Sequence, residues 1–75
     1  MESQNQQVLA YLKAGKEITP MDALRMFGCF RLAGRIYDLR QEGWPITCER
    51  REVKPNIRVG FYSMDMDQDK WPNVV

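Results

Sequence analysis

Histidine is absent from the sequence, and cysteine occurs only twice in its 75 residues. Cys29 and Cys48 do not have the spacing of a metal-binding motif, and there is no histidine to complete one. The sequence also contains no nucleophile motif and no glycine-rich phosphate loop. Because a chain this short cannot form both a core and a deep catalytic cavity, we expect that the protein is not an enzyme and holds no metal or cofactor.

Long apolar runs are missing as well. No segment approaches the roughly 18 apolar residues of a membrane-spanning helix, and the polar start MESQNQQ does not have the pattern of a signal peptide. Hydrophobic residues make up 44% of the chain and charged residues 28%, which is typical of a protein that folds in water. We therefore expect one small cytoplasmic domain with reduced cysteines and no contact with a membrane.

Two short helices joined by a tight turn are predicted in the middle of the chain. Thr19 is a suitable N-cap, Pro20 fits the first helical position, and Asp22 places a negative charge near the positive end of the helix dipole. The helix then continues to Phe27, and Gly28 supplies the left-handed conformation that ends it. Its apolar stripe consists of Ala23, Leu24 and Phe27. The pair has the form of a helix-turn-helix.

The second helix of the pair is predicted from about Arg31 to Glu42, with Gly43 at its end. Its apolar face carries Leu32, Ile36 and Leu39, with Ala33 beside them. Its opposite face carries Arg31, Gly34, Arg35, Asp38 and Glu42. Two arginines one turn apart, with a glycine between them that permits close approach, suit insertion into a DNA major groove, where arginine pairs with guanine edges. An ordinary solvent-exposed helix face has a similar composition, so the residues alone leave both interpretations open.

A further helix is predicted at the start of the chain. Ser3 can cap it, and Gln6 three residues later can complete a capping box. Its apolar positions are Val8, Leu9, Tyr11 and Leu12, and Ala14 and Gly15 end it. Ile18 is expected in a short extended segment that pairs weakly with strands predicted further along the chain. The alternative is a plain loop with one buried isoleucine.

After Gly43 the sequence changes to an alternating pattern. Trp44 and Pro45 cannot continue a helix, because the residue before proline is pushed into extended geometry. We predict two strands, at 46–53 and 57–64, joined by a turn at Pro55 and Asn56. One face of the hairpin should meet the helices, and it carries Ile57, Val59 and Phe61, with Ile46 and Cys48 beside them.

Basic side chains cluster on the outer part of this hairpin. They are Arg50, Arg51, Lys54 and Arg58, offset only by Glu49 and Glu52. Such a cluster suits contact with a phosphate backbone, and the alternative is an edge strand protected by charge. The position of the cluster beside the arginine-bearing helix favours contact with phosphates.

The run ITPMDALRMFGCFRLAGRIYDLRQEGWPI resembles the small winged helix-turn-helix domains frequently encoded by bacteriophages and prophages, which have a pattern of the type ITP.EAL..LG..RLA.RI.DLR..G..I. The resemblance extends over residues 5–63. It implies an α+β fold, a winged helix-turn-helix of three helices followed by a two-stranded β-hairpin wing. It also implies DNA binding, with helix 31–42 in the major groove and hairpin 46–64 as the wing. The sequence departs from the pattern at Gly34, where a second alanine is usual, and in its acidic tail.

We expect the winged domain to comprise residues 1–63 and the acidic tail to comprise residues 64–75. The domain carries ten basic against seven acidic residues, whereas the tail carries Lys70 against Asp65, Asp67 and Asp69. Candidates for self-association as a homodimer are Trp71, Val74 and Val75. The alternatives are docking of the tail on the domain and a disordered end.

The leading functional hypothesis is sequence-specific binding of double-stranded DNA in the cytoplasm of a bacterial host, by a transcription regulator or an architectural, excisionase-like factor. The candidate DNA-binding residues are Thr19, Arg31, Gly34, Arg35, Asp38, Arg50, Arg51, Lys54 and Arg58. The alternative is a protein-interaction module, for example an anti-repressor or a modulator of a host factor. A third hypothesis, RNA binding or assembly, lacks an aromatic platform with clear spacing.

Overall fold

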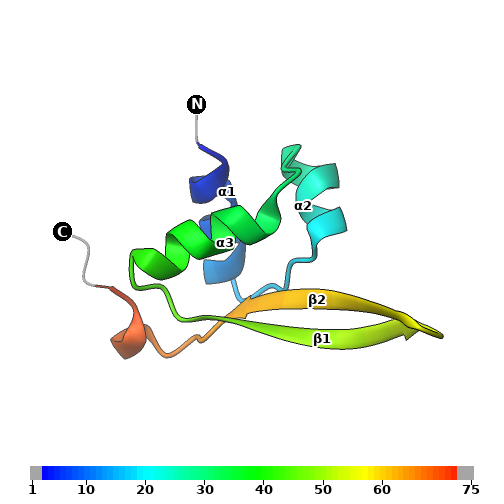
Figure 1. Cartoon of the computed structure of the whole chain (residues 1–75). Helices are drawn as coiled ribbons and strands as arrows, with labels where there is room; N and C mark the ends of the chain where they lie inside the picture. Colours follow the sequence, from blue (N-terminus) through cyan, green and yellow to red (C-terminus); the bar gives the residue numbers. More distant parts are fainter. Residues whose placement is uncertain (1–2, 73–75) are drawn as a thin grey trace.

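The computed structural model describes residues 3–72 and has three helices followed by an antiparallel hairpin (Figure 1). The elements are α1 (Gln4–Lys13), α2 (Pro20–Phe27), α3 (Leu32–Gln41), β1 (Ile46–Lys54), β2 (Ile57–Met64) and a short 3₁₀ helix, η1 (Gln68–Lys70). The predicted α+β winged helix-turn-helix fold is confirmed. None of the helices within the described residues has the length and apolar content needed to cross a bilayer.

The first two helices begin at capping boxes. In α1, Ser3 Oγ accepts a hydrogen bond from the backbone N–H of Gln6 at 3.2 Å, and the Gln6 side chain accepts one from the Ser3 N–H at 3.1 Å. Thr19 and Asp22 repeat this exchange at the start of α2, at 3.1 and 3.2 Å. Gly28 ends α2 with φ of 65°. Each box satisfies two backbone N–H groups at the helix start and so helps to define where the helix begins.

The hydrophobic core lies between the three helices and the base of the hairpin. It consists of Val8, Leu12, Ile18, Ala23, Cys29, Leu32, Ile36, Leu39, Trp44, Ile46 and Met64. Figure 1 shows α3 crossing in front of α1, with α2 to one side and the hairpin running beneath the helices. Because the apolar residues of α3 point into this core, the opposite surface of α3 faces solvent.

The hairpin joins the hydrophobic core at its base. Ile18 and Tyr62 form an isolated antiparallel bridge, with both N–H···O distances at 2.9 Å, which confirms the predicted pairing of the Ile18 segment. Ile46 and Met64, which pair across the strands, are buried beside it. The remaining length of the hairpin projects past the helices, and the molecule is therefore elongated, at 45 × 28 × 19 Å. The turn uses Asn56 with φ of 67°, a conformation that asparagine tolerates.

The prediction that Ile57, Val59 and Phe61 meet the helices is wrong. Ile57 is 50% exposed, and Val59 and Phe61 are only half-buried. The three residues do share one face of β2, but the opposite face, with Tyr62 and Met64, packs against the core. A one-residue change of phase reverses the faces of a strand, and here the backbone bridge at Tyr62 decides which face turns inward.

Three further positions expected on apolar faces are exposed: Cys48, Ala33 and Leu24, which is 37% exposed on α2. Cys48 is exposed because the hairpin has already left the helices two residues after the buried Ile46. Ala33 is exposed because helical spacing places it about 100° around α3 from the buried Leu32.

Candidate nucleic-acid interface

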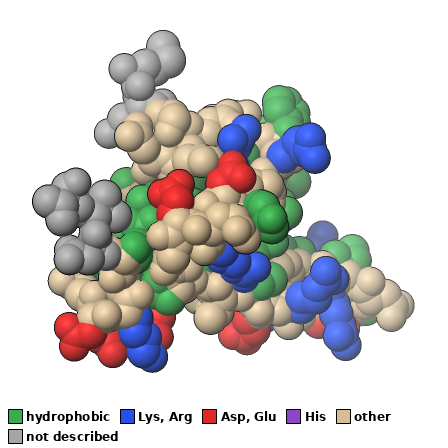
Figure 2. All heavy atoms as spheres, turned by 60° about the vertical axis from the view of Figure 1, so that its left-hand side comes forward, with side chains coloured by type: hydrophobic (Ala, Val, Ile, Leu, Met, Phe, Trp, Pro, Cys, Tyr) green, Lys and Arg blue, Asp and Glu red, His purple; other side chains and the backbone are tan. Residues whose placement is uncertain are grey.

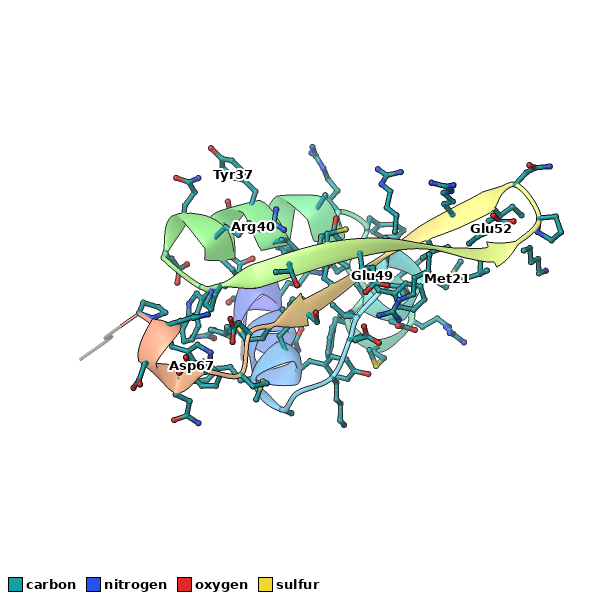
Figure 3. All side chains as sticks on the ribbon, turned by 90° about the horizontal axis from the view of Figure 1, so that it is seen from below. Met21, Tyr37, Arg40, Glu49, Glu52 and Asp67 are labelled. Atoms are coloured by element: carbon teal, nitrogen blue, oxygen red, sulfur yellow. The ribbon has the colours of Figure 1, made fainter. Side chains whose placement is uncertain are left out.

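The outward surface of α3 follows from helical spacing. Leu32, Ile36 and Leu39 point into the core, so residues half a turn away point to solvent. The exposed residues on that side are Ala33, Gly34, Tyr37, Asp38 and Gln41. Tyr37 is 63% exposed, and Figure 3 shows it pointing away from the body of the protein. A shallow hollow in this surface is lined by Arg31, Gly34, Arg35, Tyr37 and Asp38.

Arg35 lies against α1 and is only partly on the outward surface. Its Nη1 is 3.4 Å from Oδ1 of Asn5 and 3.8 Å from Oδ2 of Asp38. Its Nε is buried and has no hydrogen-bond partner among the described residues. The guanidinium therefore belongs to the contact between α1 and α3. Direct contact with a base edge, as expected from the sequence, requires this side chain to leave Asn5.

The other two arginines near α3 differ from each other. Arg40 donates from Nε to the carbonyl oxygen of Ile46 at 3.0 Å and ties the end of α3 to the start of β1. Arg31 stands at the N-cap of α3, is exposed, and forms no ion pair within residues 3–72. Arg31 is thus the arginine of this helix that the fold leaves free to contact a ligand.

Arg50 and Arg58 are on the side of the hairpin that faces the start of α2. In the strand register Arg50 pairs with Gly60, and Arg58 pairs with Glu52. The two arginines line an open groove of about 420 Å³, whose other walls include Pro20, Met21, Val59 and Tyr62. Neither arginine forms an ion pair with a described residue. Figure 2 shows basic side chains gathered over the projecting part of the hairpin.

Arg51 is held by two carboxylates on the outer face of the hairpin. Its Nη1 donates to Glu17 Oε1 at 3.1 Å, its Nη2 donates to Glu17 Oε2, and its Nε donates to Glu49 Oε1 at 3.0 Å. The guanidinium also lies 4.5 Å from the centroid of the Phe61 ring. Hydrogen bonding to Arg51 lowers the pKa of Glu49, and the hydrogen bonds to Glu49 and Glu17 raise the pKa of Arg51. Arg51 thereby connects the hairpin to the segment before α2.

The remaining predicted site residues have mixed environments. Thr19 is 8% exposed, and its hydroxyl caps α2, so the fold uses its oxygen as an acceptor. Asp38 is half exposed and close to both Asn5 and Arg35. Lys54 is exposed next to the hairpin turn. A contact of any of these residues with DNA stays a prediction.

The tail packs on the domain as far as it is described. The rings of Trp71 and Trp44 meet edge to face with centroids 5.7 Å apart, and Lys13 Nζ lies within 5.5 Å of both rings. Trp71 donates from its indole nitrogen to the carbonyl oxygen of Asp65 at 2.7 Å. A hydrogen bond from the backbone N–H of Asp67 and one from the side-chain Nζ of Lys70 lower the pKa of Asp65.

These contacts bear on the self-association hypothesis. Trp71 is half-buried against its own domain, so part of its surface is already covered within one copy. Val74 and Val75 lie outside the described residues. Self-association and the boundary between residues 63 and 64 stay predictions.

Three residues of this region, Tyr37, Glu17 and Phe30, were not predicted from the sequence. Tyr37 follows Gly34 by three residues and precedes Gln41 by four, a spacing visible in the sequence. The role of Glu17 could not be recognised from the local sequence, because its partner Arg51 lies 34 residues away. Phe30, in the turn between α2 and α3, is 85% exposed, and apolar side chains in such a turn are usually assigned to the core.

Comparison with known proteins agrees with this arrangement. The family model described as winged helix-turn-helix domain matches residues 3–66, from the cap of α1 to just beyond β2. Searches of the curated proteins and of the solved structures give no match.

Proposed function

Because the chain belongs to the winged helix-turn-helix domain family, a family with a DNA-binding fold, we propose that it binds double-stranded DNA at specific sequences. In this proposal α3 enters the major groove and the hairpin lies along the backbone as the wing. The observation that carries the proposal is the surface of α3 opposite the core, which the fold does not use. Arg31, at the start of the same helix, is exposed and has no acidic partner within residues 3–72.

The wing contributes contacts to phosphates. Arg50 and Arg58 face one groove and Lys54 stands at the tip, so three positive charges are available on the hairpin without breaking an ion pair among the described residues. Phosphate contacts fix the position of a protein on the duplex and make its affinity depend on salt. Arg51 is left out of this set because Glu17 and Glu49 already hold its guanidinium.

The biological role that fits this binding mode is that of a small phage-type regulator of transcription or an architectural, excisionase-like factor in the cytoplasm of a bacterial host. The motif resemblance of the helix-turn-helix segment supports this role. A single α3 covers too few base pairs for a tight and selective site, so two copies acting on neighbouring half-sites, as a homodimer, are part of the proposal.

Selection of binding sites from random duplex DNA tests the proposal. The full chain is expected to enrich one motif, and a fluorescence anisotropy titration of that motif should show affinity falling linearly on a log–log plot as salt rises. The spacing of recovered half-sites reports the number of copies. A chain that enriches no duplex at low salt, and whose affinity for any duplex is independent of salt, would contradict DNA binding.

A protein-interaction role is the second candidate, and one observation favours it. Phe30, in the turn before α3, is 85% exposed, and Met26, in the last turn of α2, is 45% exposed. Such groups are typical anchors of protein contacts. Retention of duplex binding by the Phe30→Ala variant would separate this surface from the DNA-binding surface, and absence of duplex binding in the parent would favour the protein-interaction role.

A further inference from the structure

The side chains that α3 presents to a ligand are mainly uncharged. Ala33, Tyr37 and Gln41 follow one another at four-residue intervals and form an exposed row along the helix. Gly34 lies beside this row, and a methyl group added there would meet no atom of another element within 4 Å. The fold itself therefore does not require glycine at position 34, which is in the first turn of α3, and glycine favours a helix less than alanine does. Close approach of a ligand surface would explain a glycine at this position.

Arginine is nearly absent from this row, because the fold engages two of the three candidates. The Arg35 guanidinium is placed against Asn5 and Asp38, and the Arg40 Nε donates to the backbone at Ile46. Arg31 is the exception, and it stands at the N-terminal end of α3. Guanine recognition by a guanidinium is thus available at one end of the helix and not along its length.

We infer that this row reads A·T base pairs, and that Arg31 reads a guanine at one edge of the same half-site; the inference rests on the proposed DNA binding. In the major groove, thymine presents a C5-methyl group that apolar side chains contact, and adenine presents the N6 and N7 atoms that a glutamine amide pairs with. The methyl group of Ala33 and the ring of Tyr37 meet thymine methyl groups. The amide of Gln41 pairs with adenine. Tyr37 and Gln41 are therefore specificity-determining residues.

Replacement of thymine by uracil in the selected duplex tests the inference most sharply, because it removes the C5-methyl group and leaves base pairing unchanged. Removal of each buried methyl group should weaken binding about fourfold. The parent chain is expected to show this weakening, whereas Tyr37→Ala, which has no ring to bury the methyl group, should bind the thymine and uracil duplexes more equally. Arg31→Ala should erase the preference for guanine at one end and keep the A·T preference. Arg25→Ala, which removes an exposed arginine of α2 that lies outside the proposed interface, is the matched control and should select the parent motif.

The outcomes separate this inference from the proposed function. A motif with guanines at its centre, or equal binding of the thymine and uracil duplexes by the parent, would overturn A·T recognition and leave DNA binding intact. Failure of the parent to enrich any duplex would overturn both. An A·T motif whose uracil form binds the parent more weakly, with the difference reduced in Tyr37→Ala, supports the inference.

Discussion

Arg51 of β1 and Glu17 of the segment before α2 form a bidentate ion pair, with an Nη1–Oε1 distance of 3.1 Å. The two residues are 34 positions apart in the sequence. The Arg51 guanidinium also lies over the Phe61 ring, with its central carbon 4.5 Å from the ring centroid. The core holds the hairpin at its base, and this pair adds a second attachment further out. We therefore treat Arg51 as a positioning residue of the wing.

The first prediction is that Glu17→Gln weakens DNA binding, although the change makes the chain more positive. Glu17→Gln removes an acid and makes the chain more positive, so long-range electrostatics alone would tighten DNA binding. If the pair holds the wing in place, the same change should weaken specific binding, because the hairpin charges are no longer fixed relative to α3. Anisotropy titrations of the parent and the variant on one duplex make the comparison.

A charge reversal provides the control for this pair. The double variant Glu17→Arg, Arg51→Glu restores an ion pair of opposite direction and should recover part of the affinity that Glu17→Gln removes. Tighter binding by Glu17→Gln than by the parent would show that the wing does not depend on this pair.

The second prediction is that Gly34→Ala raises the stability of the fold and lowers the affinity for DNA. Gly34→Ala should raise the free energy of unfolding by roughly 0.5–1 kcal/mol, because alanine favours the helix and the added methyl group meets open space. The same variant should bind the selected duplex about tenfold more weakly, since the methyl group keeps α3 from the base edges, a decrease within the ~1–3 kcal/mol of a base contact. Urea unfolding and a DNA titration measure the two effects, and a variant that is both more stable and equally tight would remove DNA contact as the reason for glycine.

Local signals in the sequence predicted the elements well. The capping boxes at Ser3 and Thr19 join residues three positions apart, and the left-handed glycine at Gly28 belongs to one residue, so short-range chemistry specifies them. The turn at Pro55 and Asn56 is similarly local. The three helices and two strands have bounds close to the prediction, whereas the short η1 in the tail was not predicted.

Long-range contacts determined what the sequence could not. The face of β2 that turns inward follows from the backbone bridge between Ile18 and Tyr62, and alternation alone is equally compatible with either face. Arg35 looked like a base-reading residue because its partner Asn5 is 30 positions away on α1. Which arginines form contacts within the fold, and which are free to bind a ligand, therefore depends on how the helices pack together.

The third prediction concerns the salt dependence of binding. Arg50→Ala and Arg58→Ala should each weaken binding to all duplexes alike and reduce the log–log salt slope by about 0.9 for each phosphate that the variant no longer neutralises. Arg25→Ala is the matched control, because Arg25 is equally cationic but sits on α2 beside Asp22 with a side chain 72% exposed. An equal decrease of the slope in all three variants would mean that net charge alone, and not the wing, governs binding.

The fourth prediction concerns the tail. Trp71→Ala should lower the free energy of unfolding by roughly 1–3 kcal/mol, less than for a fully buried tryptophan, because Trp71 is half-buried against Trp44. Exposed Gln68→Ala is the control and should leave stability unchanged. Chemical unfolding measures this effect. Sedimentation of both variants then tests self-association, since a parent dimer that Trp71→Ala dissociates would place Trp71 between two copies.

The most direct test of the central claim is an amide chemical-shift titration of the ¹⁵N-labelled full chain with the selected duplex. Recognition through α3 and the wing predicts that the largest shifts fall on Gly34, Tyr37 and Arg58. Residues at the contact between α1 and α2 should shift little. Tyr11 and Phe27, whose ring centroids lie 6.0 Å apart in an edge-to-face contact, are examples. Shifts confined to Tyr11, Phe27 and their neighbours, with the α3 surface unchanged, would contradict the claim that α3 reads DNA.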